Sequence, residues 1–172
     1  MNITSKDLAY CGTFGAAALL LPVIFHLLHL GHIFMPMYLP LVALAFFTRG
    51  NIAALTAFIT PLISGALSGM PPFYPPIAPV MALELALMVL LINTVRGRWP
   101  RLPTIVILIP ILLFGRILNA ALFFGIASLT ELPAGFVATI SFISGWPGII
   151  LMLIVIPKLI KLRSDLTRQA VS

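Results

Sequence analysis

Two charged residues, Glu84 and Arg116, stand inside long apolar runs of the sequence. Burying charge in apolar surroundings costs free energy, so such residues usually face a protein interior or water and serve function. Asn119 and Phe123 follow Arg116 by three and seven residues, which places a cation, an amide and a ring on one helix face. We expect this face to bind an anionic or polar ligand. The alternative is structural: Arg116 pairs with Glu84 or with helix carbonyls, although the rise of the helix is expected to leave Arg116 well below Glu84.

Three histidines, His26, His29 and His32, recur at intervals of three residues. On a continuous helix, neighbouring members diverge by about 60°, so one metal ion would need the helix to unwind. Gly31 and Pro36 would permit unwinding, and imidazoles do bind first-row metals. We nevertheless favour interfacial histidines at a helix end, or contacts to an organic ligand, and predict no metal site.

Motifs for catalysis are missing from the sequence. It contains neither a Gly-Lys-Ser/Thr phosphate-binding loop nor a His-Glu-x-x-His helix. Asp7 and Asp165 are expected on the opposite side of a membrane from the histidines, which argues against a nucleophile–His–Asp set. We therefore predict no catalytic residue, no enzyme activity and no cofactor.

The amino-acid composition indicates which secondary-structure elements must position these polar residues. The chain has 172 residues, of which 61% are hydrophobic and only 8% are charged, against about 25% in soluble domains. Soluble enzymes and nucleic-acid-binding proteins are therefore nearly excluded, although the net charge is +6. We predict a single all-α domain over residues 1–172, a six-helix bundle embedded in the lipid bilayer.

Apolar runs long enough for membrane helices, roughly 20 residues each, separate the polar segments. The second run is short, residues 69–76 are too rich in proline for a helix, and residues 145–148 break the last run. The predicted spans are 8–30, 35–47, 52–68, 80–95, 104–128 and 136–160.

Basic residues indicate the orientation. With the N-terminus in the cytoplasm, nine of the ten Lys and Arg residues fall on the inner side, and the tenth is Arg116 within a span. This asymmetry follows the positive-inside rule, so both termini are predicted to be cytoplasmic. Residues 96–101 form a predicted basic loop, and residues 158–168 a predicted basic extension of the last helix. The remaining polar and aromatic side chains gather outside, where we expect a ligand site to open.

Small residues recur on the first span, where Gly12 and Ala16 are four residues apart. Such spacing lets helices approach closely. It fits packing within the bundle, or an exposed face that receives a partner.

The order of several local strings resembles a known family. Residues 31–40 (GHIFMPMYLP) are followed by 60–64 (TPLIS), 68–72 (SGMPP) and 81–85 (MALEL). Together with six spans in so short a chain, these strings resemble the substrate-binding S-components of energy-coupling factor (ECF) transporters, which import vitamins into bacteria. The strings cover residues 31–85, and the span layout extends the resemblance over the whole chain.

The resemblance implies a subunit of the bacterial cytoplasmic membrane that binds a vitamin or its precursor in its outer half. It also implies partners: a transmembrane coupling protein, docked through small residues of the first helix, and two cytoplasmic ATPases. The nearest match to the family's docking pattern is Gly12 and Ala16, where relatives often have two alanines. Asn2 stands where metal-importing relatives have a histidine, which argues against cobalt or nickel.

Candidate ligand contacts combine the resemblance with position in the outer half. They are His29, His32, Tyr38, Met70, Phe73, Tyr74, Glu84, Arg116 and Asn119. Cobalamin, a flavin, a pterin and a carboxylate such as pantothenate remain open as ligands. The alternative functions are a standalone proton-coupled permease that uses Glu84, and a membrane scaffold without a ligand.

Overall fold

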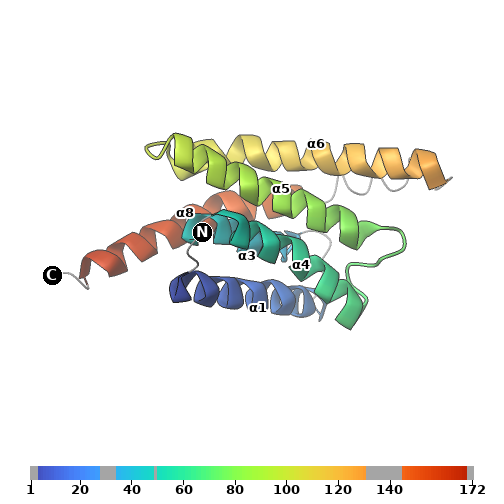
Figure 1. Cartoon of the computed structure of the whole chain (residues 1–172), viewed down its shortest axis with the longest axis horizontal. Coiled ribbons are helices and arrows are strands. Elements are labelled where there is room, and N and C mark those ends of the chain that lie inside the picture. Colours follow the sequence, from blue (N-terminus) through green and yellow to red (C-terminus); the bar gives the residue numbers. More distant parts are fainter. Residues whose placement is uncertain (1–3, 28–33, 49, 131–144, 170–172) are drawn as a thin grey trace.

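The computed structural model describes residues 4–27, 34–48, 50–130 and 145–169, and this part of the chain is helical without strands. Figure 1 shows the helices as elongated, roughly aligned rods. They are α1 (Ser5–Leu27), α3 (Tyr38–Phe47), α4 (Gly50–Ser68), α5 (Ile77–Arg98), α6 (Thr104–Thr130) and α8 (Trp146–Gln169).

Four of these helices are long and apolar enough to cross a membrane: α1, α4, α5 and α6. Their most apolar stretches have mean hydropathies between 1.5 and 2.3. Each coincides with a predicted span, within a few residues at either end. The prediction of long apolar helices is therefore confirmed at these four spans, and such helices are typical of a membrane protein.

The other two predicted spans differ from the helices that form. The second is α3, which has only 10 residues. It is about 15 Å long and too short to cross a bilayer core of about 30 Å. The sixth, 136–160, lies partly outside the described residues; α8 begins at Trp146, at the predicted break, and continues to Gln169.

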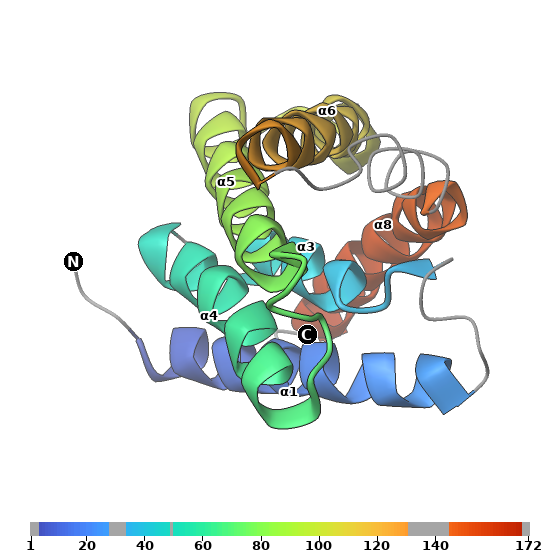
Figure 2. The same ribbon diagram turned by 90° about the vertical axis from the view of Figure 1, so that its right-hand side faces the viewer.

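The short helix α3 is the centre of the bundle. Eight of its ten residues are buried, and Leu41 and Leu44 are fully enclosed. It packs against α1, α4, α5 and α8, and Figure 2 shows it surrounded by these helices. The core therefore forms around a short helix that is itself largely buried.

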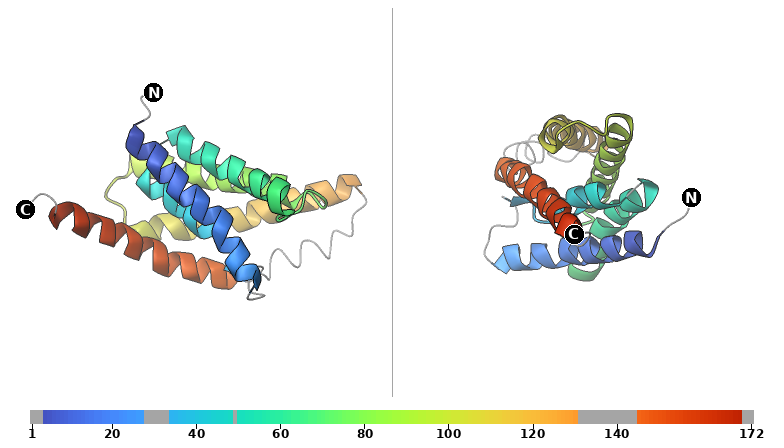
Figure 3. Two further views of the ribbon diagram at one scale, coloured as in Figure 1. Left: turned by 90° about the horizontal axis from the view of Figure 1, so that it is seen from below. Right: turned by 90° about the vertical axis from the view of Figure 1, so that its left-hand side faces the viewer.

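Helix α1 is the peripheral element. Only 6% of its apolar stretch is buried, and Figure 3 shows it lying along the outside of the bundle. Its inner face packs on α3 through aromatic rings, with Phe14 and Phe47 centroids 4.9 Å apart. Gly12 and Ala16 lie on its exposed side, and nothing lies within 4 Å of the Cβ that Gly12 lacks.

The two ends of the bundle differ in charge. The start of α1, the connection from α5 to α6 and the end of α8 lie at one end, and residues 69–76 lie at the other (Figure 1). We call the first the basic end, because most lysines and arginines of the described helices lie there. Arg96 and Arg98 belong to the last turn of α5, so the prediction of a loop from residue 96 was wrong at that point. The apolar period of α5 simply continues to its basic C-terminal turn, which suits the helix dipole.

The proline-rich turn between α4 and α5 is confirmed as non-helical. Gly69 ends α4 with a φ of 71°, and Ser64 donates a hydrogen bond of 2.6 Å to the carbonyl of Met70. The turn then folds back over Gly65. A Cβ at Gly65 would lie 2.7 Å from the backbone oxygen of Pro71 and 2.9 Å from the Phe73 ring. The missing side chain is therefore what lets the turn pack on α4.

We expect Gly65→Ala to lower the free energy of unfolding by about 1–3 kcal/mol, because the added methyl group overpacks against backbone that cannot rotate away. Thermal unfolding in detergent would measure the change. Gly125→Ala is the matched control, since nothing lies within 4 Å of its missing Cβ. Equal melting temperatures for the two variants would contradict the close approach.

Candidate functional site

Three helices bring polar side chains together around one carboxyl group. Glu84 projects from α5, Tyr38 from the start of α3 and Asn119 from α6. The Tyr38 hydroxyl donates a hydrogen bond of 2.5 Å to Glu84 Oε2, and Asn119 Nδ2 donates one of 2.7 Å to the same oxygen. We call these three residues together with Arg116 the polar cluster.

The polar cluster is buried. The exposed fractions are 1% for Glu84, 5% for Tyr38 and 6% each for Asn119 and Arg116. A buried carboxyl without partners would cost several kcal/mol, which explains why two donors converge on it. The cluster confirms the expectation that the polar residues of these apolar helices face the protein interior.

One atom of the cluster has no partner. The side-chain oxygen of Asn119 is buried and accepts no hydrogen bond within the described part of the protein. An orphaned buried acceptor costs about 1–3 kcal/mol. Asn119 therefore offers an acceptor that a ligand's N–H or O–H group can satisfy.

Arg116 lies beside the carboxyl rather than well below it, so the depth expected from the sequence was wrong. Gly115, the preceding residue, contacts Glu84: a Cβ at Gly115 would lie 3.1 Å from Glu84 Oε1. Glu84 is 14 residues before the end of α5 and Arg116 is 12 residues after the start of α6, so the two lie at a similar distance from the connection between these helices. The charge of Arg116 is near enough to interact with both Glu84 and Tyr38.

The residue that precedes α8 packs against Arg116. One guanidinium nitrogen, Nη2, lies 2.6 Å from the sulfur of Met35. A Cβ at Gly145 would lie 1.9 Å from the same nitrogen, and Gly145 has a φ of 98°. The predicted break in the last helix thus has a local reason: glycine provides both the backbone conformation and the space for Arg116.

The residues of the turn after α4 that were predicted to contact the ligand take no part in the hydrogen bonds of the polar cluster. Met70, Phe73 and Tyr74 are in the turn after α4, with exposed fractions of 49%, 47% and 78%. Their ligand contacts remain predictions. His29 and His32 lie outside the described residues, and no group of three potential metal ligands occurs among the residues that are described.

Two contributors to the site were missed in the sequence, Met35 and Gly145. Nothing in the sequence marks the Met35 thioether as part of the site, because methionines are common in apolar helices. Gly145 was noted only as part of a helix break, and its left-handed conformation next to a buried cation could not be inferred. Tyr38 was predicted as a ligand contact, but its hydrogen bond to Glu84 across 46 positions was not.

The polar cluster brings a carboxyl, a phenol, an amide and a guanidinium together inside an apolar bundle. Such groups can donate and accept hydrogen bonds, and the carboxyl can carry a proton. The cluster lies about two turns from the start of α5 and about four turns from its basic end. It is therefore nearer the proline-rich turn.

Comparison with known proteins gives no relative: the chain matches no protein-family model, no curated protein and no solved structure.

Gly145→Ala should lower the melting temperature more than Gly69→Ala does. Both substitutions place a side chain on a backbone of positive φ, but only the methyl group at residue 145 collides with Arg116. The expected difference in unfolding free energy is about 1–3 kcal/mol. Similar losses for the two variants would show that the backbone conformation alone explains both.

Tyr38→Phe should destabilise the protein by about 1–3 kcal/mol, because it removes one of the two donors to a buried carboxyl. Tyr74→Phe is the control, since the Tyr74 side chain is 78% exposed and its change should stay within about 0.5 kcal/mol. Both values come from thermal or denaturant unfolding. A Tyr38→Phe variant as stable as the Tyr74→Phe variant would rule out the hydrogen bond.

Proposed function

We propose that this chain is the membrane-embedded substrate-binding subunit of an ECF-type importer, which captures a vitamin or its precursor. The observation that carries the proposal is the polar cluster, with its unsatisfied Asn119 oxygen, inside a bundle of membrane-length helices. Polar groups at such depth are costly and are usually retained for a ligand or an ion. The resemblance of residues 31–85 to S-components supplies the class of ligand.

In this proposal the basic end faces the cytoplasm, as the positive-inside rule favours. The chain then forms six membrane-embedded helices with both termini in the bacterial cytoplasm. The polar cluster is reached from the outer side, past the turn after α4. Glu84, Arg116 and Asn119 hold the polar part of the ligand, and the exposed rings of Phe73 and Tyr74 cover it together with Met70, His29 and His32.

The proposed partners are a transmembrane coupling protein and two ATPases of an ECF module. Two features support α1 as the docking element: its low burial and the exposed small residues Gly12 and Ala16. Small residues let a second helix approach closely within a membrane.

The second candidate is a standalone proton-coupled permease. It is favoured by one observation: Glu84 is a buried carboxyl that shares one of its oxygens between two donors. Such a group can take up and release a proton as part of a transport cycle.

Thermal unfolding with cobalamin, riboflavin, folate and pantothenate tests the binding function, after mass spectrometry of small molecules that co-purify with the protein. A ligand of the folded state should raise the melting temperature by mass action. Asn119→Ala should weaken the ligand at least tenfold, or about 1.4 kcal/mol. Asn93→Ala, an amide near the basic end of α5, should not. Stabilisation by none of these compounds, with none co-purifying, would instead favour a scaffold.

Uptake into proteoliposomes separates the importer from the permease. With the compound identified by binding, we expect uptake only when the ECF module and ATP are present. Glu84→Gln should then reduce uptake through weaker binding. Uptake by the chain alone, driven by a proton gradient and abolished by Glu84→Gln, would overturn the importer proposal.

A further inference from the structure

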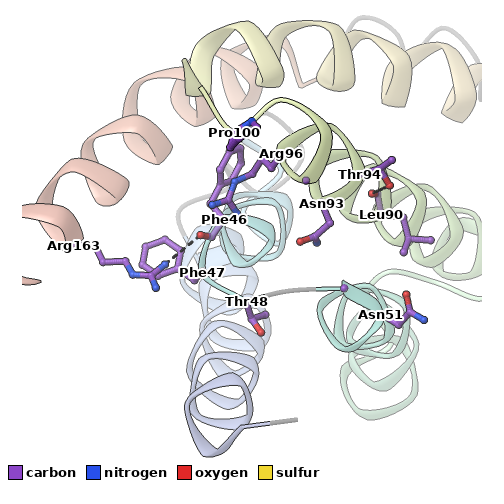
Figure 4. Close-up of a pocket in the computed structure, with 12 residues that line it drawn as sticks. Phe46, Phe47, Thr48, Asn51, Leu90, Asn93, Thr94, Arg96, Pro100 and Arg163 are labelled. Atoms are coloured by element: carbon purple, nitrogen blue, oxygen red, sulfur yellow. Dashed lines mark hydrogen bonds between the residues drawn. The ribbon is translucent and has the colours of Figure 1, made fainter. Parts of the chain in front are cut away.

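A cavity of about 730 Å³ opens at the basic end, far from the polar cluster. It lies where α3 ends, α4 begins and α5 approaches its last turn, with α8 alongside (Figure 4). Its walls combine apolar rings with polar and cationic groups. They include Phe46, Thr48, Asn51, Asn93, Arg96 and Arg163.

The two arginines of this cavity are held in place by the end of α3. Arg96, from α5, donates a hydrogen bond of 2.9 Å to the Ala45 carbonyl, and Arg163, from α8, donates one of 3.2 Å to the Phe46 carbonyl. These carbonyls belong to the last turn of a helix, the negative end of its dipole. Arg163 is thus anchored at the bundle, although the C-terminal part of α8 is largely exposed.

Aromatic rings fix the guanidinium planes as well. Arg96 lies over the Phe46 ring at 5.1 Å, and Arg163 lies over the Phe47 ring at 5.0 Å. Figure 4 shows the two side chains reaching the end of α3 from different helices. Both guanidiniums are therefore oriented toward the end of α3, although the Arg163 side chain is otherwise exposed.

The cavity has the chemistry of an anion site. A guanidinium has five N–H groups, and Arg163 uses one of its nitrogens on the Phe46 carbonyl. Among the described residues that line the cavity, none is Asp or Glu. Asn51, Asn93 and Thr94 add amide and hydroxyl groups. The Asp7 carboxylate accepts a hydrogen bond from the Thr48 hydroxyl of the cavity wall, so one negative charge lies nearby. The two guanidiniums outweigh it and suit a phosphate group, which arginine binds in a bidentate manner.

Its position points to a lipid as the source of that phosphate. The cavity sits at the ends of membrane-length helices, the level of lipid headgroups. One turn deeper, on the same helix faces as Asn51 and Thr94, stand Leu55 and Leu91, with exposed fractions of 56% and 37%. An acyl chain can lie along these side chains while the headgroup occupies the cavity. Basic pockets between membrane helices bind anionic headgroups in this way.

We propose that the cavity at the basic end, between Arg96 and Arg163, binds the phosphate headgroup of an anionic membrane lipid. The site is independent of the vitamin site and of the importer function. Its occupation would tie α8 to the ends of α3 and α5.

Thermal unfolding in detergent, titrated with phosphatidylglycerol, tests the site, and native mass spectrometry counts the lipids retained. We expect Arg96→Gln and Arg163→Gln each to weaken the lipid at least tenfold. The matched controls are Arg98→Gln and Arg168→Gln, which remove the same charge from the same helices outside the cavity. Asn93→Glu provides a variant that leaves both α3 caps intact, and its negative charge should abolish retention.

Several results would overturn the proposal. Equal stabilisation by phosphatidylcholine would remove the requirement for an anion. Equal stabilisation by glycerol 1-phosphate or inorganic phosphate at the same concentration would assign the cavity to a soluble anion. Control variants that lose as much affinity as the cavity variants would indicate diffuse surface charge. Retention unchanged by Asn93→Glu would place the lipid elsewhere.

Discussion

The carboxyl of Glu84 imposes the strictest geometric condition on this bundle. It is almost completely buried, and both hydrogen bonds to its Oε2 atom come from other helices. Helices α3, α5 and α6 must therefore keep a fixed separation and register, since losing a donor leaves a buried polar group unsatisfied. Gly115 allows α6 to approach α5 at this level, where a Cβ would lie 2.5 Å from the Met88 sulfur. The contact between α5 and α6 therefore provides close packing and also a hydrogen bond to the buried carboxyl.

The short helix α3 connects this condition to the basic end. Its first residue, Tyr38, donates to Glu84, and carbonyls near its other end accept from Arg96 and Arg163. The last carbonyls of a helix have no partner within the helix itself. The arginines satisfy them and bring the basic end of α8 against the bundle. Helix α3 is about 15 Å long, and a shift along its axis would disturb the hydrogen bonds at both of its ends.

Much of this architecture can be predicted from the sequence, because helices of membrane length are recognisable from their apolar composition. Apolar runs located α1, α4, α5 and α6, and polar residues within those runs identified Glu84, Arg116 and Asn119 as interior groups. Three-dimensional partners were harder to infer. The pairing of Tyr38 with Glu84, the contact of Arg116 with Met35 and the docking of Arg163 on Phe46 join positions 46 to 117 residues apart. These contacts depend on how neighbouring helices are aligned along their axes, which the apolar runs alone do not specify; the depth of Arg116 relative to Glu84 was misjudged for this reason.

The depth of the polar cluster bears on how a ligand could be moved. Between Glu84 and the basic end, α5 presents Leu85, Met88, Val89 and Ile92 to the core, all buried. A permease of fixed orientation would have to open a polar path through this layer and past α3, which is largely buried. The polar cluster lies only about two turns of α5 from the end nearer the proline-rich turn. Under the proposed importer function, the ligand therefore reaches the site from this nearer end, and its delivery across the membrane requires a partner that moves or opens the bundle. An exposed, small-residue face on α1 is consistent with such a partner.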